Sequence, residues 1–281
     1  MNKLYIYCDG GFGNRFNVLV AGLWISEKLG YHPIVYWPEN NWCGASFRQI
    51  FEPFVDLLNT FNVEHFNNYK TLNLIHENQM SVDSFVNVKN VTNITQTKDI
   101  LQGRDILYFN NLIPSFVEDP VGTCSKIKFR DDLIQIAEEQ IRNNTTEEFF
   151  GIHIRKTDFG SRSDLAEKIC LDIVKGNQNK KFFICSDDKE TENKFCLHKN
   201  VFKFDKKQYV AKFTEGSWNE HVREINSNFN VTRSSESVTN AIVDLLILSR
   251  STIISPDVGS TFADTAKLIN KSRRILERDQ A

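Results

Sequence analysis

The sequence lacks the features that mark membrane, secreted or nucleic-acid-binding proteins. No apolar run is long enough to cross a bilayer, and the apolar stretch after Met1 is too short for a secretory signal. The formal net charge of −2 creates no overall field that would attract nucleic acid or an anionic membrane. The six cysteines show no CxxC spacing. We therefore expect a cytoplasmic protein with reduced cysteines, no integral membrane segment and no nucleic-acid partner.

Several motifs of metal and covalent catalysis are also missing. The six histidines show no metal-ligand spacing such as HExxH, and no Asp-x-Asp pair is present that could hold a divalent cation on a nucleotide sugar. No Gly-x-Ser-x-Gly elbow occurs either. We expect no metal and no resident cofactor. Negative charge on any ligand would then be stabilised by cationic side chains and by the N-termini of helices.

The chain instead alternates predicted strands with predicted helices, which indicates parallel sheets. In the first half, strands are expected at 3–8, 33–37 and 105–109, and helices at 15–29, 46–58 and 131–142. In the second half, strands are expected at 149–154, 182–185, 201–204 and 252–255, and helices at 164–175, 234–250 and 262–270. The polar segment 143–147 is the predicted linker. The expected fold is α/β, with two Rossmann-type domains, residues 1–145 and 146–281, that face a cleft.

The segment Gly151–Asp158 carries the strongest functional signal. Arg155, Lys156 and Asp158 follow a predicted buried strand, and His153 lies just inside its carboxyl end. Ligands of open α/β sheets bind outside the carboxyl ends of the strands, and a guanidinium matches phosphate oxygens. A strand followed by a solvated charged turn explains this segment alone equally well.

Two further strand-to-helix junctions suit anions. The first is a glycine-rich turn at the start of a helix, with Gly11, Gly13, Asn14 and Arg15. The second, at 255–263, places hydroxyl groups at a helix N-terminus, those of Ser260 and Thr261. Taken alone, the first junction is explained equally well by a purely structural turn. Taken alone, the second is explained better by an ordinary helix N-cap than by an anion site. Three such junctions in one chain favour a diphosphate ligand.

Asp244 lies in an apolar stretch of the long predicted helix, so its carboxylate needs a partner. The edge of a guanine base, with its N1–H and N2–H2 donors, would supply one. The alternative is a partly exposed position or a structural ion pair with Arg250 or Lys267. By sequence alone this alternative is the stronger one.

Four blocks, in the same order along the chain, resemble the α1,6-fucosyltransferases and their relatives. His153–Asp158 is similar to their His-x-Arg-Arg-Thr-Asp peptide, and 182–188 to a second motif that ends in Ser/Thr-Asp-Asp. The third block, 237–251 with 259–262, resembles a third motif. The turn at 10–15 resembles a loop shared by nodulation, α1,2- and protein O-fucosyltransferases. The resemblance covers the second half and the first forty residues, whereas 61–102 has no match.

The resemblance implies a GT-B-type, inverting, metal-independent glycosyltransferase with GDP-fucose as donor and a glycan as acceptor. It implies that Arg155 binds the β-phosphate and is catalytic, and that His153 and Asp244 read the guanine. The other donor-binding residues expected are Gly11, Gly13, Asn14, Arg15, Lys156, Asp187, Ser260, Thr261 and Phe262.

Departures from the family pattern leave alternatives open. Lys156 replaces a second arginine, and no glutamate follows the motif where these enzymes carry a general base. Asp158 or Asp164 is the candidate base here, or the base is dispensable. The scaffold could use another donor, such as UDP-xylose or another GDP-sugar, or could be a non-catalytic binder of nucleotide sugars or glycans. Trp37 and Trp42 are candidates to stack on an acceptor sugar; Phe47 is assigned to the core.

Overall fold

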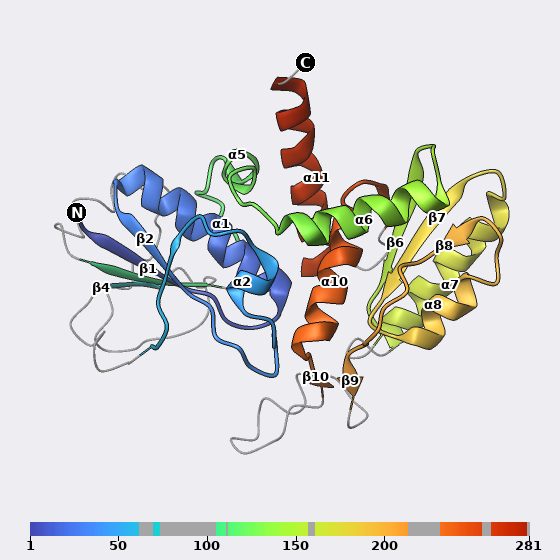
Figure 1. Ribbon diagram of the computed structural model, residues 1–281, viewed down its shortest axis with the longest axis horizontal. Helices are drawn as coiled ribbons and strands as arrows, with labels where there is room; N and C mark the ends of the chain where they lie inside the picture. Colours follow the sequence, from blue (N-terminus) through green and yellow to red (C-terminus); the bar gives the residue numbers. More distant parts are fainter. Residues whose placement is uncertain are drawn as a thin grey trace. The chain divides into compact units, whose positions relative to one another are not determined.

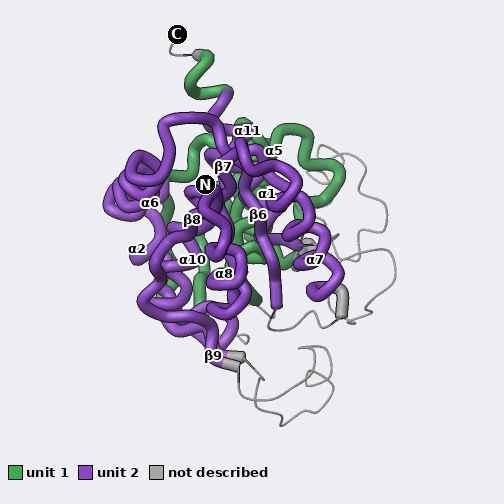
Figure 2. Tube along the Cα trace, turned by 90° about the vertical axis from the view of Figure 1, so that its right-hand side faces the viewer, with its two compact units in different colours: residues 1–38, 53–128, 275–281 green, residues 39–52, 129–274 purple. Residues whose placement is uncertain are grey.

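The chain folds into two compact units, seen in a computed structural model. The structure describes residues 1–61, 70–73, 105–110, 112–156, 161–212, 231–254 and 260–279. Unit 1 comprises 1–38, 53–128 and 275–281, and unit 2 comprises 39–52 and 129–274 (Figure 2). The predicted division of the chain into two domains, residues 1–145 and 146–281, stays a prediction.

Unit 1 is built on a five-stranded parallel sheet with the order β3-β2-β1-β5-β4 (Figure 1). Its strands are β1 (Lys3–Tyr7), β2 (His32–Tyr36), β3 (Asp56–Leu57), β4 (Lys70–Asn73) and β5 (Ile106–Phe109). Helix α1 (Phe12–Leu29) connects β1 to β2 and packs against α5 (Pro120–Cys124). Gly30 ends α1 at a φ of 68°, a left-handed conformation that favours glycine, as its predicted capping role requires.

Unit 2 is built on a four-stranded parallel sheet with the order β11-β6-β7-β8. Its strands are β6 (Phe149–Ile154), β7 (Lys181–Ser186), β8 (Val201–Phe202) and β11 (Thr252–Ile254). Figure 1 shows α7 (Ser161–Gly176) and α8 (Lys189–Phe195) on one side of β6 and β7, with α10 (Ser235–Leu248) on the other. The remaining elements are α2 (Phe47–Ile50) and α6 (Asp131–Asn144), which pack on α10, the antiparallel pair β9 (Ala211–Lys212) and β10 (Val231–Thr232), and α11 (Thr261–Asp279).

The core of unit 2 is dominated by aliphatic and phenylalanine side chains from both sides of a helix–sheet interface. Ile152, Ile154, Phe182 and Ile184 of the sheet pack with Phe195 of α8, all of them 1% exposed or less. Because apolar burial contributes roughly 25 cal/mol per Å², this cluster stabilises the sheet whose edge carries the predicted site.

Most predicted elements are present within a few residues, but two predictions were wrong in extent. The helix expected at 46–58 is reduced to α2, because Pro53 cannot donate a helical hydrogen bond and disfavours helical backbone before it. The last helix runs to Asp279 rather than ending at Asn270. Helix α5 and the short strands β3, β4, β9 and β10 were not predicted.

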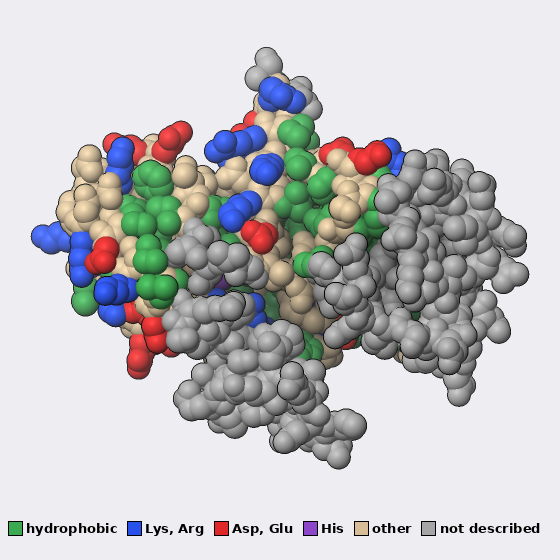
Figure 3. Space-filling view, turned by 180° about the vertical axis from the view of Figure 1, so that it is seen from behind, with side chains coloured by type: hydrophobic (Ala, Val, Ile, Leu, Met, Phe, Trp, Pro, Cys, Tyr) green, Lys and Arg blue, Asp and Glu red, His purple; other side chains and the backbone are tan. Residues whose placement is uncertain are grey.

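The surface shows a local concentration of positive charge on the C-terminal helix. Figure 3 shows cationic side chains gathered along it, and the exposed ones are Lys267, Lys271, Arg274 and Arg278. All six cysteines are free thiols, and five are buried. Within the described ranges, no helix combines the length and apolarity needed to traverse a bilayer.

Candidate functional site

Three predicted site residues of unit 2 come together at the carboxyl end of β6. His153 is 6% exposed, and its ring stacks on Phe262 with centroids 4.8 Å apart and an interplanar angle of 26°. Its Nδ1 lies 3.3 Å from the Oγ of Ser260. Burial, followed by the charges of Arg155 and Lys206, lowers the pKa of His153 to about 3. His153 is therefore a neutral imidazole at the sheet edge where Rossmann-type folds bind ligands.

Ser260 and Thr261 form the start of α11. The carbonyl of Ser260 accepts the N–H of Asp264 at 3.0 Å, and its Oγ accepts that of Ala263 at 3.4 Å. The capping role considered from the sequence is therefore present. Binding of an anion at this helix start stays a prediction.

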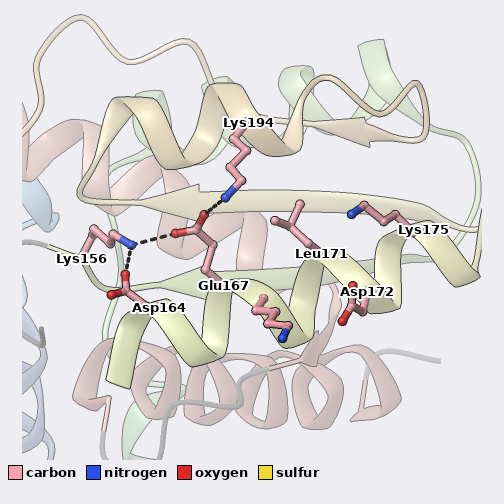
Figure 4. Close-up of a pocket in the computed structure, with 8 residues that line it drawn as sticks. Lys156, Asp164, Glu167, Leu171, Asp172, Lys175 and Lys194 are labelled. Atoms are coloured by element: carbon pink, nitrogen blue, oxygen red, sulfur yellow. Dashed lines mark hydrogen bonds and ion pairs between the residues drawn. The ribbon is translucent and has the colours of Figure 1, made fainter. Parts of the chain in front are cut away.

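Lys156 joins the ends of two neighbouring strands to the start of α7. Its backbone N–H donates to Oδ1 of Asp187, which follows β7, at 2.6 Å. Its ammonium donates to Oδ1 of Asp164 at 2.5 Å and to Oε2 of Glu167 at 2.8 Å, and Lys194 donates to Oε1 of Glu167 at 2.5 Å. Figure 4 shows these four charged side chains meeting at one end of a cavity of about 480 Å³ between α7 and α8.

This ion-pair cluster changes the chemistry of the candidate base. The hydrogen bond from Lys156, then its charge, lowers the pKa of Asp164. Burial would raise the pKa of Glu167, but its bonds to Lys156 and Lys194 outweigh burial and leave the pKa lowered. Glu167 was not among the site residues predicted from the sequence. Its position three residues after Asp164 on a helix, which places both on one face, was the available signal.

Arg155 is half-buried directly after β6, and its carbonyl accepts a hydrogen bond from the hydroxyl of Ser163 in α7. The other candidate base, Asp158, lies outside the described residues. In the parts of the chain that the structure describes, no group of His, Cys, Asp or Glu side chains could hold a metal ion.

Asp244 is buried and belongs to an ionic cluster centred on Lys206. Its Oδ2 lies 2.5 Å from Nζ of Lys206, which also contacts Oε1 of Glu192 and the carbonyl of Ser186, both at 2.5 Å. Glu192 accepts the N–H of Ser186 at 2.8 Å and the hydroxyl of Tyr209 at 2.5 Å. Burial, opposed by Lys206 and reinforced by Glu192, raises the pKa of Asp244 to about 7.

The ion-pair alternative for Asp244 is thus present, but with a partner that the sequence did not indicate. Arg250 contacts Glu138 at 3.4 Å and Lys267 contacts Asp264 at 3.2 Å, so neither proposed partner was right. Lys206 lies in a lysine-rich stretch without hydrophobic periodicity. Such a pattern predicts residues exposed to solvent. Only the folded chain brings this stretch under α10.

The glycine-rich turn belongs to unit 1, where Arg15 is fully buried. Its Nε donates to the carbonyl of Gly10 at 2.6 Å and its Nη1 to that of Pro38 at 2.5 Å. The guanidinium carbon lies 5.1 Å from the centroid of the Trp37 ring. These contacts give Arg15 a structural function, because its fork of donors holds two loops of unit 1 together.

The other residues of this turn are arranged along the start of α1. Gly11 is the N-cap of the helix, Gly13 is buried in its first turn and Asn14 is half-buried. Their role at the donor, and that of Arg15, stays a prediction. Among the aromatic candidates, Phe47 is 3% exposed, as its assignment to the core requires, and Trp42 lies in unit 2 with its ring centroid 5.9 Å from the guanidinium of Arg233.

The fold of the chain is similar to those of solved fucosyltransferases. The NodZ α-1,6-fucosyltransferase co-crystallised with GDP matches with a TM-score of 0.59 and 17% identity, over 95% of this chain and 92% of that chain. A structure of fucosyltransferase NodZ from Bradyrhizobium matches equally well, with a TM-score of 0.59 and 17% identity over the same shares. POFUT1 in complex with GDP-fucose matches with a TM-score of 0.52 and 11% identity, over 95% of this chain and 94% of that chain.

No protein-family model and no curated protein sequence matches the chain. The structural likeness confirms the expected α/β, GT-B-like fold with two parallel sheets. It also confirms, at the level of fold, the resemblance to GDP-fucose-dependent enzymes that the four sequence blocks indicated.

Proposed function

We propose that the protein is a glycosyltransferase that moves fucose from GDP-fucose to a hydroxyl group of a glycan, with inversion and without a metal. The observation that carries this proposal is the set of contacts among His153, Ser260 and Phe262 beside Arg155. It lies at the sheet edge where ligands of such folds bind. Structures with the same fold hold GDP in NodZ and GDP-fucose in POFUT1.

The donor is proposed to bind by charge and by base recognition. Arg155 faces the β-phosphate, and the amides at the start of α11 add hydrogen bonds from Ser260 and Thr261. Neutral His153 and the carboxylate of Asp244 recognise the guanine, and Phe262 supports the imidazole by stacking. From unit 1, the turn with Gly11, Gly13, Asn14 and Arg15 is proposed to complete the donor site.

The proposed reaction is a single in-line displacement. The acceptor oxygen forms a bond to the anomeric carbon while the bond from that carbon to the β-phosphate oxygen breaks, so the electron pair leaves with GDP. Positive charge develops on the sugar ring, as in other glycosyl transfers, and negative charge grows on the leaving oxygens. A fixed guanidinium gains the most interaction energy at that moment, which is why Arg155 is assigned to catalysis.

The acceptor proton passes to a carboxylate, and the two candidates differ. Asp164 is bound to Lys156 and has a lowered pKa, which makes it a weak base in this arrangement. Asp158, two residues after Lys156 in the sequence, is the other candidate. The ion pair of Asp164 with Lys156 also favours a second candidate function, because it leaves Asp164 a weak base. This function is that of a nucleotide-sugar-binding protein without transferase activity.

Two measurements on the purified protein test the proposal. Ligands raise apparent stability by mass action, so GDP should raise the unfolding temperature where UDP at the same concentration does not. Incubation with GDP-fucose, UDP-xylose and other nucleotide sugars, with a panel of glycan acceptors, should then release GDP from GDP-fucose and give a fucosylated product. Stabilisation by GDP without release or transfer would support the binding protein, and stabilisation by UDP alone would overturn the donor assignment.

A further inference from the structure

A single ammonium group lies between two buried carboxylates in unit 2. The side chains of Lys206, Asp244 and Glu192 are 4%, 3% and 0% exposed, and Nζ lies 2.5 Å from one oxygen of each acid. Charged side chains are almost never buried to this degree unless they are paired. When both acids are ionised, the cluster has two negative charges and one positive charge, so one negative charge is left uncompensated within it.

The two carboxylates are not equally satisfied. Glu192 accepts from Lys206, from the N–H of Ser186 and from the hydroxyl of Tyr209, so both of its oxygens are bound. Asp244 uses Oδ2 for Lys206, whereas its buried Oδ1 has no hydrogen-bond partner among the described residues. The unused acceptor of the cluster is therefore Oδ1 of Asp244, which lacks, within the described part of the chain, the hydrogen-bond donor that a buried carboxylate oxygen needs and which an N–H group of a ligand would supply.

We propose that Lys206 is a positioning residue for the donor base. Through Oδ2 it fixes the rotamer of Asp244 and keeps this carboxylate ionised, so that Oδ1 is presented to the N–H donors of the guanine edge. This inference rests on the proposed function, because it assigns the support of Asp244 rather than the donor itself. Lys206 also lies close enough to lower the pKa of His153, so one cation influences both residues assigned to the base.

The groups that face Asp244 act on its ionisation in opposite directions. Lys206 and the more distant Lys203 favour the carboxylate, whereas burial and the charge of Glu192 disfavour it. The thiol of Cys185, with a pKa raised by burial, and the neutral ring of His153 carry no charge near neutral pH. Because the ionised form accepts from guanine, donor binding is expected to weaken as pH falls through the pKa of Asp244.

Two substitutions should therefore move the pH dependence of donor binding in opposite directions. Lys206→Met removes the cation that favours the Asp244 carboxylate, so it should raise the midpoint pH of donor binding. Glu192→Gln removes the competing negative charge, so Lys206 pairs with Asp244 only and the midpoint pH should fall. The probe is GDP-fucose, whose diphosphate diester does not titrate in the relevant range, and the measurement is its dissociation constant by calorimetry from about pH 5.5 to about pH 9. A midpoint raised by one unit weakens binding below it roughly tenfold. Lys203→Met, which alters a lysine paired with Asp205 at 3.5 Å, is the matched control and should move the midpoint least.

A second readout separates positioning from general support of the fold. Inosine diphosphate lacks the 2-amino group of guanine, so wild-type protein should prefer GDP, and Lys206→Met should reduce that preference. Unchanged midpoints, or shifts of both variants in the same direction, would overturn the role of Lys206. If Lys206→Met does not fold, Glu192→Gln decides alone, since an unchanged midpoint refutes the inference. Failure of wild-type protein to bind GDP-fucose would instead refute the proposed function, and the inference with it.

Discussion

Replacing His153 with glutamine should remove a specific part of the acid sensitivity of this protein. The folded chain holds the ring neutral, with a pKa of about 3, whereas the ordinary value is 6.5. Below pH 6.5 the unfolded chain binds a proton at this residue and the folded chain does not. The stability contributed by the neutral ring is thus complete above that pH and is lost as pH falls toward 3.

The size of the effect follows from these two values. Between about pH 7.5 and about pH 5, the difference in proton binding should lower the free energy of unfolding by about 2 kcal/mol. A folded-state pKa one unit higher would change this figure little, because at pH 5 the folded ring would still be largely neutral. Glutamine cannot titrate and can still bond to Ser260, so the variant should lack this loss.

The assay is urea unfolding of both proteins at the two pH values, with free energies from linear extrapolation. The stability advantage of wild type over His153→Gln should shrink by about 2 kcal/mol at the lower pH. The titration of Asp244 is common to both proteins and cancels in this difference. The control is Phe182→Leu, a change at a buried residue of the same sheet. It should lower the free energy of unfolding by a similar amount at both pH values. An equal advantage of wild type at both pH values would refute the argument that burial holds His153 neutral.

Two further substitutions test the catalytic assignment and the packing of unit 2. Arg155→Ala should reduce fucose transfer roughly 10²-fold or more with little change in thermal unfolding, whereas Arg142→Ala, at an exposed position of α6, should leave turnover intact; wild-type turnover by the first variant would exclude Arg155 from catalysis. Gly44→Ala should lower the free energy of unfolding by about 1–3 kcal/mol, because its Cβ would lie 2.5 Å from the carbonyl oxygen of Arg233. Gly176→Ala, where a Cβ meets no atom within 4 Å, is its control, and equal stabilities of the two variants would contradict the reasoning.

Local pattern was sufficient to predict much of the fold. Strand β6 was predicted at its observed bounds, Phe149–Ile154, because a run of apolar and β-branched residues between polar segments has few other solutions. Helix α10 was predicted within two residues at each end, since its cap and its apolar period are both local signals. The polar stretch that contains β4 has no such period, so its strand depends on pairing with β5.

Long-range pairing decided what the sequence could not. The segment 39–52 belongs to unit 2, although the residues before and after it in the sequence belong to unit 1, and the N–H of Gly44 donates to the carbonyl of Arg233 at 2.8 Å. Such a contact joins residues almost two hundred positions apart, and no periodicity within either segment indicates it.

The sequence by itself determined the α/β class, the order of the elements and the placement of His153, Arg155 and Lys156 at the end of a buried strand. Hydrophobic period and turn residues act over a few positions, so these features are written locally. Only the tertiary structure decided which charges meet: Lys156 with Asp164 and Glu167, and Lys206 with Asp244 and Glu192. Ionic contacts depend on distance and burial in the folded state, and neither quantity exists until the strands and helices have packed.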